Sequence, residues 1–341
     1  SEVCLRLIVD PTTPHFMKSL FVCVSASLLG WSMSLADVTV SKKENGDFAV
    51  KIDGELFTEY RHQGVNVPCF YPIIGPEQVT MTRKYPLEDA GKGEAKDHPH
   101  HTSLWYAHGD VNGLDFWHGA FEKEKGGKIV HSETISHQNG DKEATLITRS
   151  KWLANEGDKV VCEDVRTMTF GKTANGSRYV DLTLVVKATN GDVVFGDTKE
   201  GTMAIRTHPQ LRLKGEVAAG SALNSAGDKD KDLWGKAAKW VDYWGKVDGK
   251  EVGVAIFGHP SNPRHPTTWH ARDYGLVAAN PFGYSHFFKG QGKDGKLTVK
   301  NGESLTFRYR FAFHGGAHDE ATLKAHYKDF AESVPTGAAS E

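Results

Sequence analysis

Cysteine is scarce in this chain, and neither sign of charge is in excess. Four cysteines occur among 341 residues, and 41 basic residues against 43 acidic ones give a formal net charge of -2. Because no block of lysine and arginine is dense enough to follow a phosphate backbone, the composition argues against nucleic acid as a partner. A neutral or mildly polar ligand fits this composition better.

Long apolar runs are missing after residue 36, where no stretch approaches the roughly 18–20 uninterrupted apolar residues of a membrane span. Before it, Met17-Lys18, the apolar stretch 20–31 and the small residue Ala36 have the pattern of an export signal. We therefore expect residues 1–16 to be upstream sequence from a misplaced start and residues 17–36 to be a cleaved signal peptide. The mature protein is then periplasmic or secreted and free of the membrane, with an uncleaved anchor as the alternative.

Nucleotide-binding motifs are absent as well. The chain has no Gly-x-Gly-x-x-Gly and no phosphate-binding loop, so no cofactor is predicted, and a divalent metal is left open. Signal cleavage would leave two cysteines, Cys69 and Cys162. They either form one disulfide in an oxidising compartment or stay as buried free thiols, and neither has the spacing of metal ligands.

Alternation of apolar and polar residues with a period of two is the dominant local pattern. Two strong runs, 180–187 and 305–313, predict half-buried strands, and many Asn-Gly and Asp-Gly pairs between runs predict tight antiparallel turns. Weaker runs are 48–52, 144–152, 160–170, 203–206, 216–217, 240–243 and 252–257. Without a repeat or a linker, these runs predict one all-β, mostly antiparallel sandwich or supersandwich over 37–316.

One short helix is predicted in the C-terminal segment 317–341. Leu323, Tyr327 and Phe330 share one helical face after the acidic pair Asp319-Glu320, whose charges suit a helix start. The remainder of this segment is expected to be a tail.

Three segments interrupt the alternation and gather chemically active residues. The first, 97–118, holds five histidines, three carboxylates and four large aromatic residues, and the others are 197–208 and 259–283. Since the loops and strand ends of a sandwich meet on one rim or one concave face, we expect these segments to build one site.

A metal site is the weaker interpretation of this site. Neutral imidazoles bind zinc, copper, nickel or iron, and His98 and His100 would share a face of a strand. No helical His-x-x-x-His accompanies them, so they are weak candidates and no metal site is predicted.

Proton chemistry on a sugar is the stronger interpretation. Aromatic rings stack on the apolar face of a pyranose, polar side chains bond its hydroxyls, and histidine with glutamate supplies an acid and a base near neutral pH. The predicted catalytic residues are His101, His108, Glu200 and His270. The predicted substrate-binding residues are Trp105, Asp110, Asn112, Arg206, His259, Arg264, Trp269, Arg272, Asp273, Asn280 and Phe282. For each of them, a purely structural role in the core or in tying loops is the alternative.

The same segments resemble a known family. Asp-His-Pro-His-His at 97–101, Asp-Thr-Lys-Glu-Gly at 197–201 and Trp-His-Ala-Arg-Asp-Tyr-Gly at 269–275 are similar to signature blocks of the bacterial PmoA-like family of unknown function. Thr102-Ser103 departs from the Arg-Gly of that pattern. The family is sometimes labelled methane oxygenase, but a membrane monooxygenase subunit needs several spanning helices. The resemblance implies instead an exported sandwich similar to galactose-mutarotase-like supersandwiches.

The leading hypothesis is an exported carbohydrate-active enzyme that uses His/Glu acid–base chemistry as an epimerase, lyase or glycoside-processing enzyme. Its expected partner is a sugar or oligosaccharide, with no nucleic acid and no membrane. The alternatives are a non-catalytic sugar-binding module with the same groove and, second, a His-ligated metalloenzyme.

Overall fold

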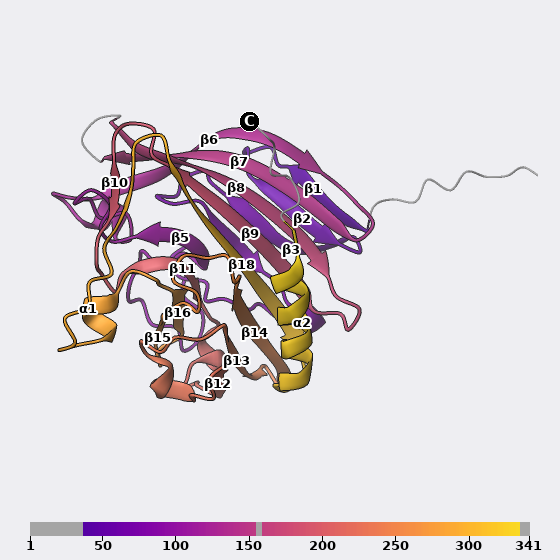
Figure 1. Cartoon of the computed structure of the whole chain (residues 1–341). Helices are drawn as coiled ribbons and strands as arrows, with labels where there is room; N and C mark the ends of the chain where they lie inside the picture. Colours follow the sequence, from indigo (N-terminus) through magenta and orange to yellow (C-terminus); the bar gives the residue numbers. More distant parts are fainter. Residues whose placement is uncertain (1–36, 155–158, 335–341) are drawn as a thin grey trace, which may run out of the picture. The chain divides into compact units, whose positions relative to one another are not determined.

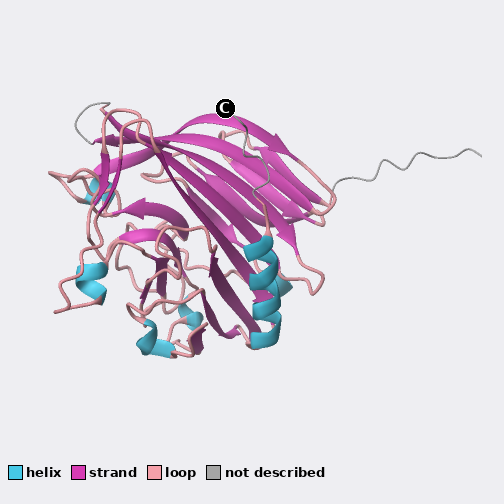
Figure 2. Cartoon of the chain, in the orientation of Figure 1, coloured by secondary structure: helices cyan, strands magenta, loops and turns pink. Residues whose placement is uncertain are grey.

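A computed structural model describes residues 37–154 and 159–334. The expected upstream segment 1–16 and signal peptide 17–36 lie outside the described residues. Strands dominate the described part and helices are few, as Figure 2 shows, which confirms the all-β prediction. No helix in these described ranges is long and apolar enough to cross a membrane.

Eight antiparallel strands form the first sheet, in the order β1-β2-β3-β4-β5-β11-β16-β15. Its central strands β5 and β11 pair through Tyr106 and Met203, so segments far apart in the sequence lie side by side. The strands are β1 (Val38–Lys42), β2 (Phe48–Ile52), β3 (Glu55–Arg61), β4 (Cys69–Ile73), β5 (Leu104–His108), β11 (Gly201–Arg206), β16 (Leu276–Ala279) and β15 (Trp269–Ala271).

The second sheet also has eight antiparallel strands, in the order β12-β13-β14-β18-β9-β8-β7-β6. Its long strands cross the molecule in Figure 1. They are β12 (Gly220–Asn224), β13 (Trp240–Val247), β14 (Lys250–Gly258), β18 (Ser304–Gly315), β9 (Arg178–Lys187), β8 (Val160–Lys172), β7 (Glu143–Ala154) and β6 (Gly127–Gln138). A separate pair joins β10 (Val193–Phe195) to β17 (Leu297–Val299).

The core lies between the inner faces of the two sheets. Tyr106 of β5 packs against Trp152 of β7 and Phe307 of β18, with ring centroids 5.9 Å apart in both contacts. Phe70 of β4 meets Phe170 of β8 in the same way. The strong alternating runs became β9 and β18, whose apolar residues fill this interface while their polar neighbours face away.

The predicted C-terminal helix is α2 (Glu320–Glu332), which lies beside β14 in Figure 1. Asp319 caps it by accepting hydrogen bonds from the backbone N–H groups of Ala321 and Thr322. Leu323 and Phe330 are buried in a satellite cluster against the second sheet. A second helix that was not predicted, α1 (Tyr284–Phe287), is a single turn between β16 and β17, too short to show helical periodicity in the sequence.

Two further details correct or refine the sequence-based prediction. The run 216–217 is not a strand, because a turn with Gly215 at φ 123° precedes it and β12 begins only at Gly220. Of the two alternatives for the mature cysteines, the structure has buried free thiols at Cys69 and Cys162. Burial raises the pKa of Cys69 to about 12, so this thiol is unreactive near neutral pH.

Candidate functional site

The candidate site lies on the outer face of the first sheet, around β5 and β11. Tyr106 points to the core, so its neighbour Trp105 points outward, because successive side chains of a strand alternate between the two faces. The ring of His101 stacks on Trp105, with centroids 5.3 Å apart. Arg206 ends β11 on the same outer face, two residues beyond the partner of Trp105.

Arg206 is the centre of this arrangement. Its Nη1 donates to Nδ1 of His101 at 2.9 Å, and its Nη2 donates to Oδ1 of Asp97 at 3.0 Å. The guanidinium also lies over the ring of Tyr274, 4.6 Å from the centroid. Arg83 holds Asp97 from the other side at 2.6 Å. Burial opposes ionisation of Asp97, but the two arginines outweigh it and hold its pKa at about 2.

His101 is neutral and has a defined tautomer. Burial lowers its pKa well below the usual value, and the charges of His100 and Arg206 act in the same direction. Because the Arg206 N–H donates to Nδ1, the single proton of the neutral ring is on Nε2. Within the described ranges no hydrogen bond is made by Nε2, so this N–H is available to a ligand.

Flat side chains continue the site across the sheet. His98 stacks between His101 and Tyr274, with interplanar angles of 8° and 9°. Arg272 lies over both Tyr274 and Trp234, the latter at 4.8 Å. Trp234, just after the short turn Asp230–Leu233, then meets the ring of His270 on β15. These stacks provide aromatic and guanidinium surfaces of the kind that pack on sugar rings.

Glu200 comes from the loop before β11 and is 20% exposed. It pairs with Lys199, and its charge acts on His118, His270 and Tyr274, which come from three separate segments. Asn280 positions this loop, since its amide donates to the carbonyls of Thr198 and Lys199 at 3.0 and 2.9 Å. Asn280 thus holds the backbone directly before Glu200.

The histidines around Glu200 differ in protonation. Burial lowers the pKa of His270 to about 4 and that of His100 to about 3, and each ring keeps one buried nitrogen without a partner among the described residues. His118 is the opposite case. A 2.7 Å hydrogen bond to Asp115 raises its pKa above the usual value. A carboxylate, neutral imidazoles and one readily protonated imidazole therefore occur together, which is the inventory of acid–base chemistry.

We call this set the outer-face cluster. Its members are Asp97, His98, His100, His101, His118, Glu200, Arg206, Trp234, His270, Arg272 and Tyr274. Five of the predicted binding or catalytic residues thus lie together: His101, Glu200, Arg206, His270 and Arg272. Trp105 lies directly beneath them, and Asp273 lies in the turn between Arg272 and Tyr274.

Other predicted residues lie elsewhere, in structural positions. His108 is on the inner side of β5, where Nε2 contacts the Gly196 carbonyl at 2.9 Å and the ring packs among Phe195 and Phe282. His108 is two positions after the inward-facing Tyr106, so strand alternation turns it inward as well. Trp269 is buried and donates to the Ala238 carbonyl.

Four loop residues also tie the fold together. Arg264 donates to the carbonyls of Pro281 and Lys296. His259 bonds Arg308 at 2.7 Å and packs on Phe330 of α2. Asp110 and Asn112 shape the turn after β5, where Asp110 accepts from the Gly113 N–H and Asn112 bonds the backbone of Val194.

The sequence-based prediction missed four members of the outer-face cluster. Asp97 and His118 lie within the first predicted segment, and Tyr274 lies within the third. The predicted segments therefore contained these three residues, although none of them was predicted individually as a site residue. Trp234 had no signal of its own, since it follows a short turn outside all three segments.

No group of three or more metal-binding side chains occurs in the part of the chain that the structure describes. The weak metal candidates His98 and His100 have ring centroids 5.7 Å apart at an interplanar angle of 74°.

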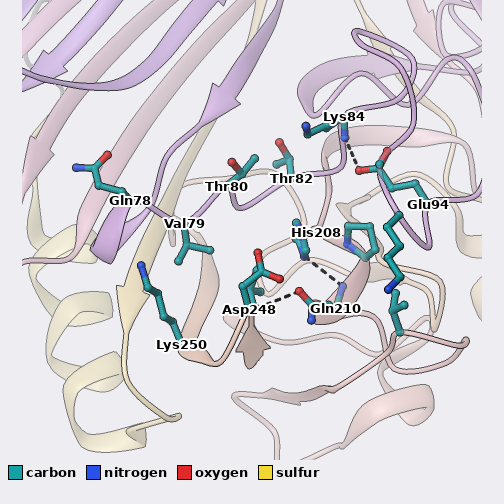
Figure 3. A pocket seen from close by; sticks show the side chains of 15 residues that line it. Gln78, Val79, Thr80, Thr82, Lys84, Glu94, His208, Gln210, Asp248 and Lys250 are labelled. Carbon is teal, nitrogen blue, oxygen red and sulfur yellow. Dashed lines mark hydrogen bonds between the residues drawn. The ribbon is translucent and has the colours of Figure 1, made fainter.

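A different cavity, of about 560 Å³, is shown in Figure 3. Its polar side chains mainly hold loops. His208 accepts from the Gln210 N–H, Gln210 accepts from the Asp248 N–H, and Glu94 accepts from the Lys84 N–H. Because no Phe, Tyr or Trp lines it and it contains none of the predicted site residues, the outer-face cluster is the better candidate.

Comparison with known proteins identifies a family. A model described as a family of unknown function, DUF6807, matches residues 47–328. The chain belongs to the DUF6807 family. A family of unknown function was expected, but nothing supports the PmoA-like and methane oxygenase labels that the expectation carried. No curated protein matches the chain.

Among solved structures, a galactose mutarotase-like protein from Clostridium acetobutylicum is similar to this chain. The match has 9% sequence identity and a TM-score of 0.30, and covers 82% of this chain and 99% of that one. A likeness this weak carries no argument about function.

Proposed function

We propose that this DUF6807 protein is a carbohydrate-active enzyme that binds a sugar on the outer-face cluster and acts on it by proton transfer. The observation that carries the proposal is the position of Glu200, whose charge reaches His118, His270 and Tyr274 beside a stack of flat side chains. Acid–base work needs such a carboxylate and an imidazole on different segments, with room for a ligand between them.

In this proposal the flat faces bind and the ionisable groups react. Trp234 and Tyr274 pack on the apolar face of a pyranose, and the Nε2–H of His101 donates to a sugar oxygen. Glu200 accepts a proton from the sugar, and His118 returns one to the oxygen where negative charge develops. The proton count is unchanged, which suits an epimerase or lyase. The neutral ring of His270 is the second proton carrier.

Export is the second part of the proposal. The apolar stretch 20–31 and the small residue Ala36 support cleavage before Asp37 and a periplasmic or secreted location. N-terminal sequencing of protein made in a bacterial host tests it, with Asp37 expected as the first residue. Retention of Met17 in a membrane fraction would contradict cleavage.

The enzymatic part is tested with wild type, Glu200→Gln and His101→Ala on a panel of oligosaccharides and oxidised sugars. Calorimetry measures binding, and NMR measures turnover with and without a chelator. We expect turnover to fall roughly 10²–10⁴-fold in Glu200→Gln with binding retained, because positioned proton transfer typically contributes that much. Glu251→Gln, on an exposed residue of β14, is the matched control.

The other outcomes separate the alternatives. Binding without turnover in wild type would show a sugar-binding module. Loss of activity to chelator, with recovery on adding one metal, would show a metalloenzyme. Equal turnover in wild type and both variants would place the chemistry outside the outer-face cluster.

A further inference from the structure

A second cavity, of about 170 Å³, adjoins the outer-face cluster. His100 and His118 belong to both. The ring of His100 lies 4.4 Å from that of His118 and 4.5 Å from that of His101, so the cavity and the proposed sugar site share a wall. This volume is smaller than the roughly 300–1,000 Å³ of a pocket that holds a whole small molecule. It has room for a substituent of a ligand.

The walls of this cavity are mostly apolar. They are formed by Val65, Val67, Pro86, Leu87, Pro99, Phe116, Trp117 and Phe121, with Gly64, Asn66, Thr102 and Gly119. No lysine, arginine, aspartate or glutamate lines it. The polar side chains of the wall are Asn66, His100, Thr102 and His118, and of these only His118 is readily protonated, so a charged group would have at most one charged partner and would otherwise lose its hydration, which is costly. The occupant is therefore uncharged and mainly apolar.

Three buried polar atoms of the lining residues add a second requirement. Nε1 of Trp117, Nε2 of His100 and Oγ1 of Thr102 have no hydrogen-bond partner in the described part of the chain, although Trp117 is only 1% exposed. An indole N–H can only donate, and a buried donor without an acceptor costs free energy. A ligand group with one acceptor oxygen and an apolar end would accept a hydrogen bond from the indole N–H of Trp117 and pack against the apolar wall residues.

We infer that this cavity accepts an acyl group, such as the acetyl of an N-acetylated sugar, while the sugar ring lies on the outer-face cluster. The methyl group packs against the apolar walls, and the carbonyl oxygen accepts from Trp117. The inference rests on the proposed function, which it narrows to acylated sugars. Phe121, 55% exposed at this cavity, then covers the acyl group from the solvent side.

The experiment compares N-acetylglucosamine and N-acetylgalactosamine with glucose and galactose by calorimetry. We expect each N-acetyl sugar to bind at least tenfold more tightly than its parent. Val65→Phe, which fills the cavity from its wall, should reduce the N-acetyl sugars to the affinity of the parents. Val185→Phe, on a half-buried residue of β9 in the second sheet, is the control and should change nothing.

A sugar-independent measurement separates this inference from the proposed function. N-methylacetamide is titrated into ¹⁵N-labelled protein, and the indole N–H signal of Trp117 is followed, with Trp117→Phe for its assignment. A downfield shift in wild type that Val65→Phe abolishes supports the acyl site even if no sugar in the panel binds. Equal affinity for acetylated and parent sugars, or no indole shift, would overturn the inference and leave the proposed function standing on its own tests.

Discussion

Two groups of histidines and carboxylates in this molecule differ in their hydrogen bonding. In the second sheet, Asp242 of β13 is buried and accepts from His314 at 3.0 Å and from His318 at 2.6 Å, one imidazole on each oxygen. In the outer-face cluster, His100, His101 and His270 are buried without a bonded carboxylate, although Glu200 is near. The outer-face cluster also holds paired histidines, His118 with Asp115 and His98 with Asp97, so its distinguishing feature is the three buried rings that have no bonded carboxylate.

The difference appears in the electrostatics. Burial lowers the pKa of His314, but Asp242 outweighs it and raises the value above normal, so this pair is ionic. His100, His101 and His270 have lowered pKa values because burial outweighs the nearby groups that would favour protonation. A bonded pair stabilises the fold, whereas a buried ring nitrogen without a partner costs stability.

Asp242→Asn should produce the largest loss of stability. It removes the negative member of a buried pair, and breaking such pairs typically costs about 3–5 kcal/mol. Urea denaturation at pH 6 measures the free energy of unfolding, with Asp141→Asn on an exposed turn as the control. A loss as small as that of the control would mean that the two buried histidines find other partners.

The contributions of His270 and His314 to the stability of the protein should depend on pH with opposite signs. The pKa of His270 falls to about 4, so between pH 6.5 and 4 the unfolded chain binds a proton that the folded chain does not, and stability falls as pH falls. His314, with a raised pKa, stabilises fully below pH 6.5 and loses this contribution as pH rises through its folded value. Asp242, with a lowered pKa, contributes above about pH 3.8 and loses its contribution as pH falls below that.

His270→Gln should therefore flatten the stability curve on its acid side, by up to about 3 kcal/mol between pH 6.5 and 4. His314→Gln should do the reverse and cost most below pH 6.5. Denaturation series at four pH values for both variants measure this. If the free energies of unfolding of the two variants changed with pH in the same way, the proposed difference between the two regions would be wrong.

Arg206→Lys should have a smaller effect, centred on His101. A lysine ammonium cannot hold Nδ1 of His101 and Asp97 in the fixed geometry of a guanidinium, so the Nε2–H tautomer loses its preference. We expect sugar affinity to fall about tenfold, which corresponds to about 1.4 kcal/mol. Tautomer populations are read from ¹⁵N NMR shifts. Arg310→Lys, which breaks a paired contact with Asp181 in the second sheet, should leave the His101 signals unchanged.

Glu320→Gln should have the smallest effect, with no measurable change in the denaturation midpoint. Glu320 pairs with Lys324 one turn along α2, but the two side chains are 53% and 66% exposed. Exposed pairs gain little because water screens them. A clear shift would show that α2 depends on surface charge more than on its buried face.

The sequence determined the elements whose pattern is local. β9 and α2 each bury one face, and β18 alternates core-facing aromatic residues with Arg308 and Arg310, which pack on Phe330 of α2, so the periods of two and 3.6 are visible in the residues themselves. β5 and β16 have every residue buried, so their sequences show no alternation of apolar and polar residues. The edge strand β6 is largely exposed in its second half, so that half has no apolar face. None of these three could be recognised from the pattern alone.

For the site, the sequence located the three segments, and the tertiary structure decided which side chains meet. The order β5-β11-β16-β15 brings His101, Arg206 and His270 to one face, while the same strand β5 turns His108 into the core. Trp234 joins through a turn that no periodicity marks. The order of the strands depends on pairing between distant segments, and the direction of each side chain depends on which face of the first sheet packs against the second sheet. These non-local energies are set only when the whole core assembles, so a local pattern cannot contain them.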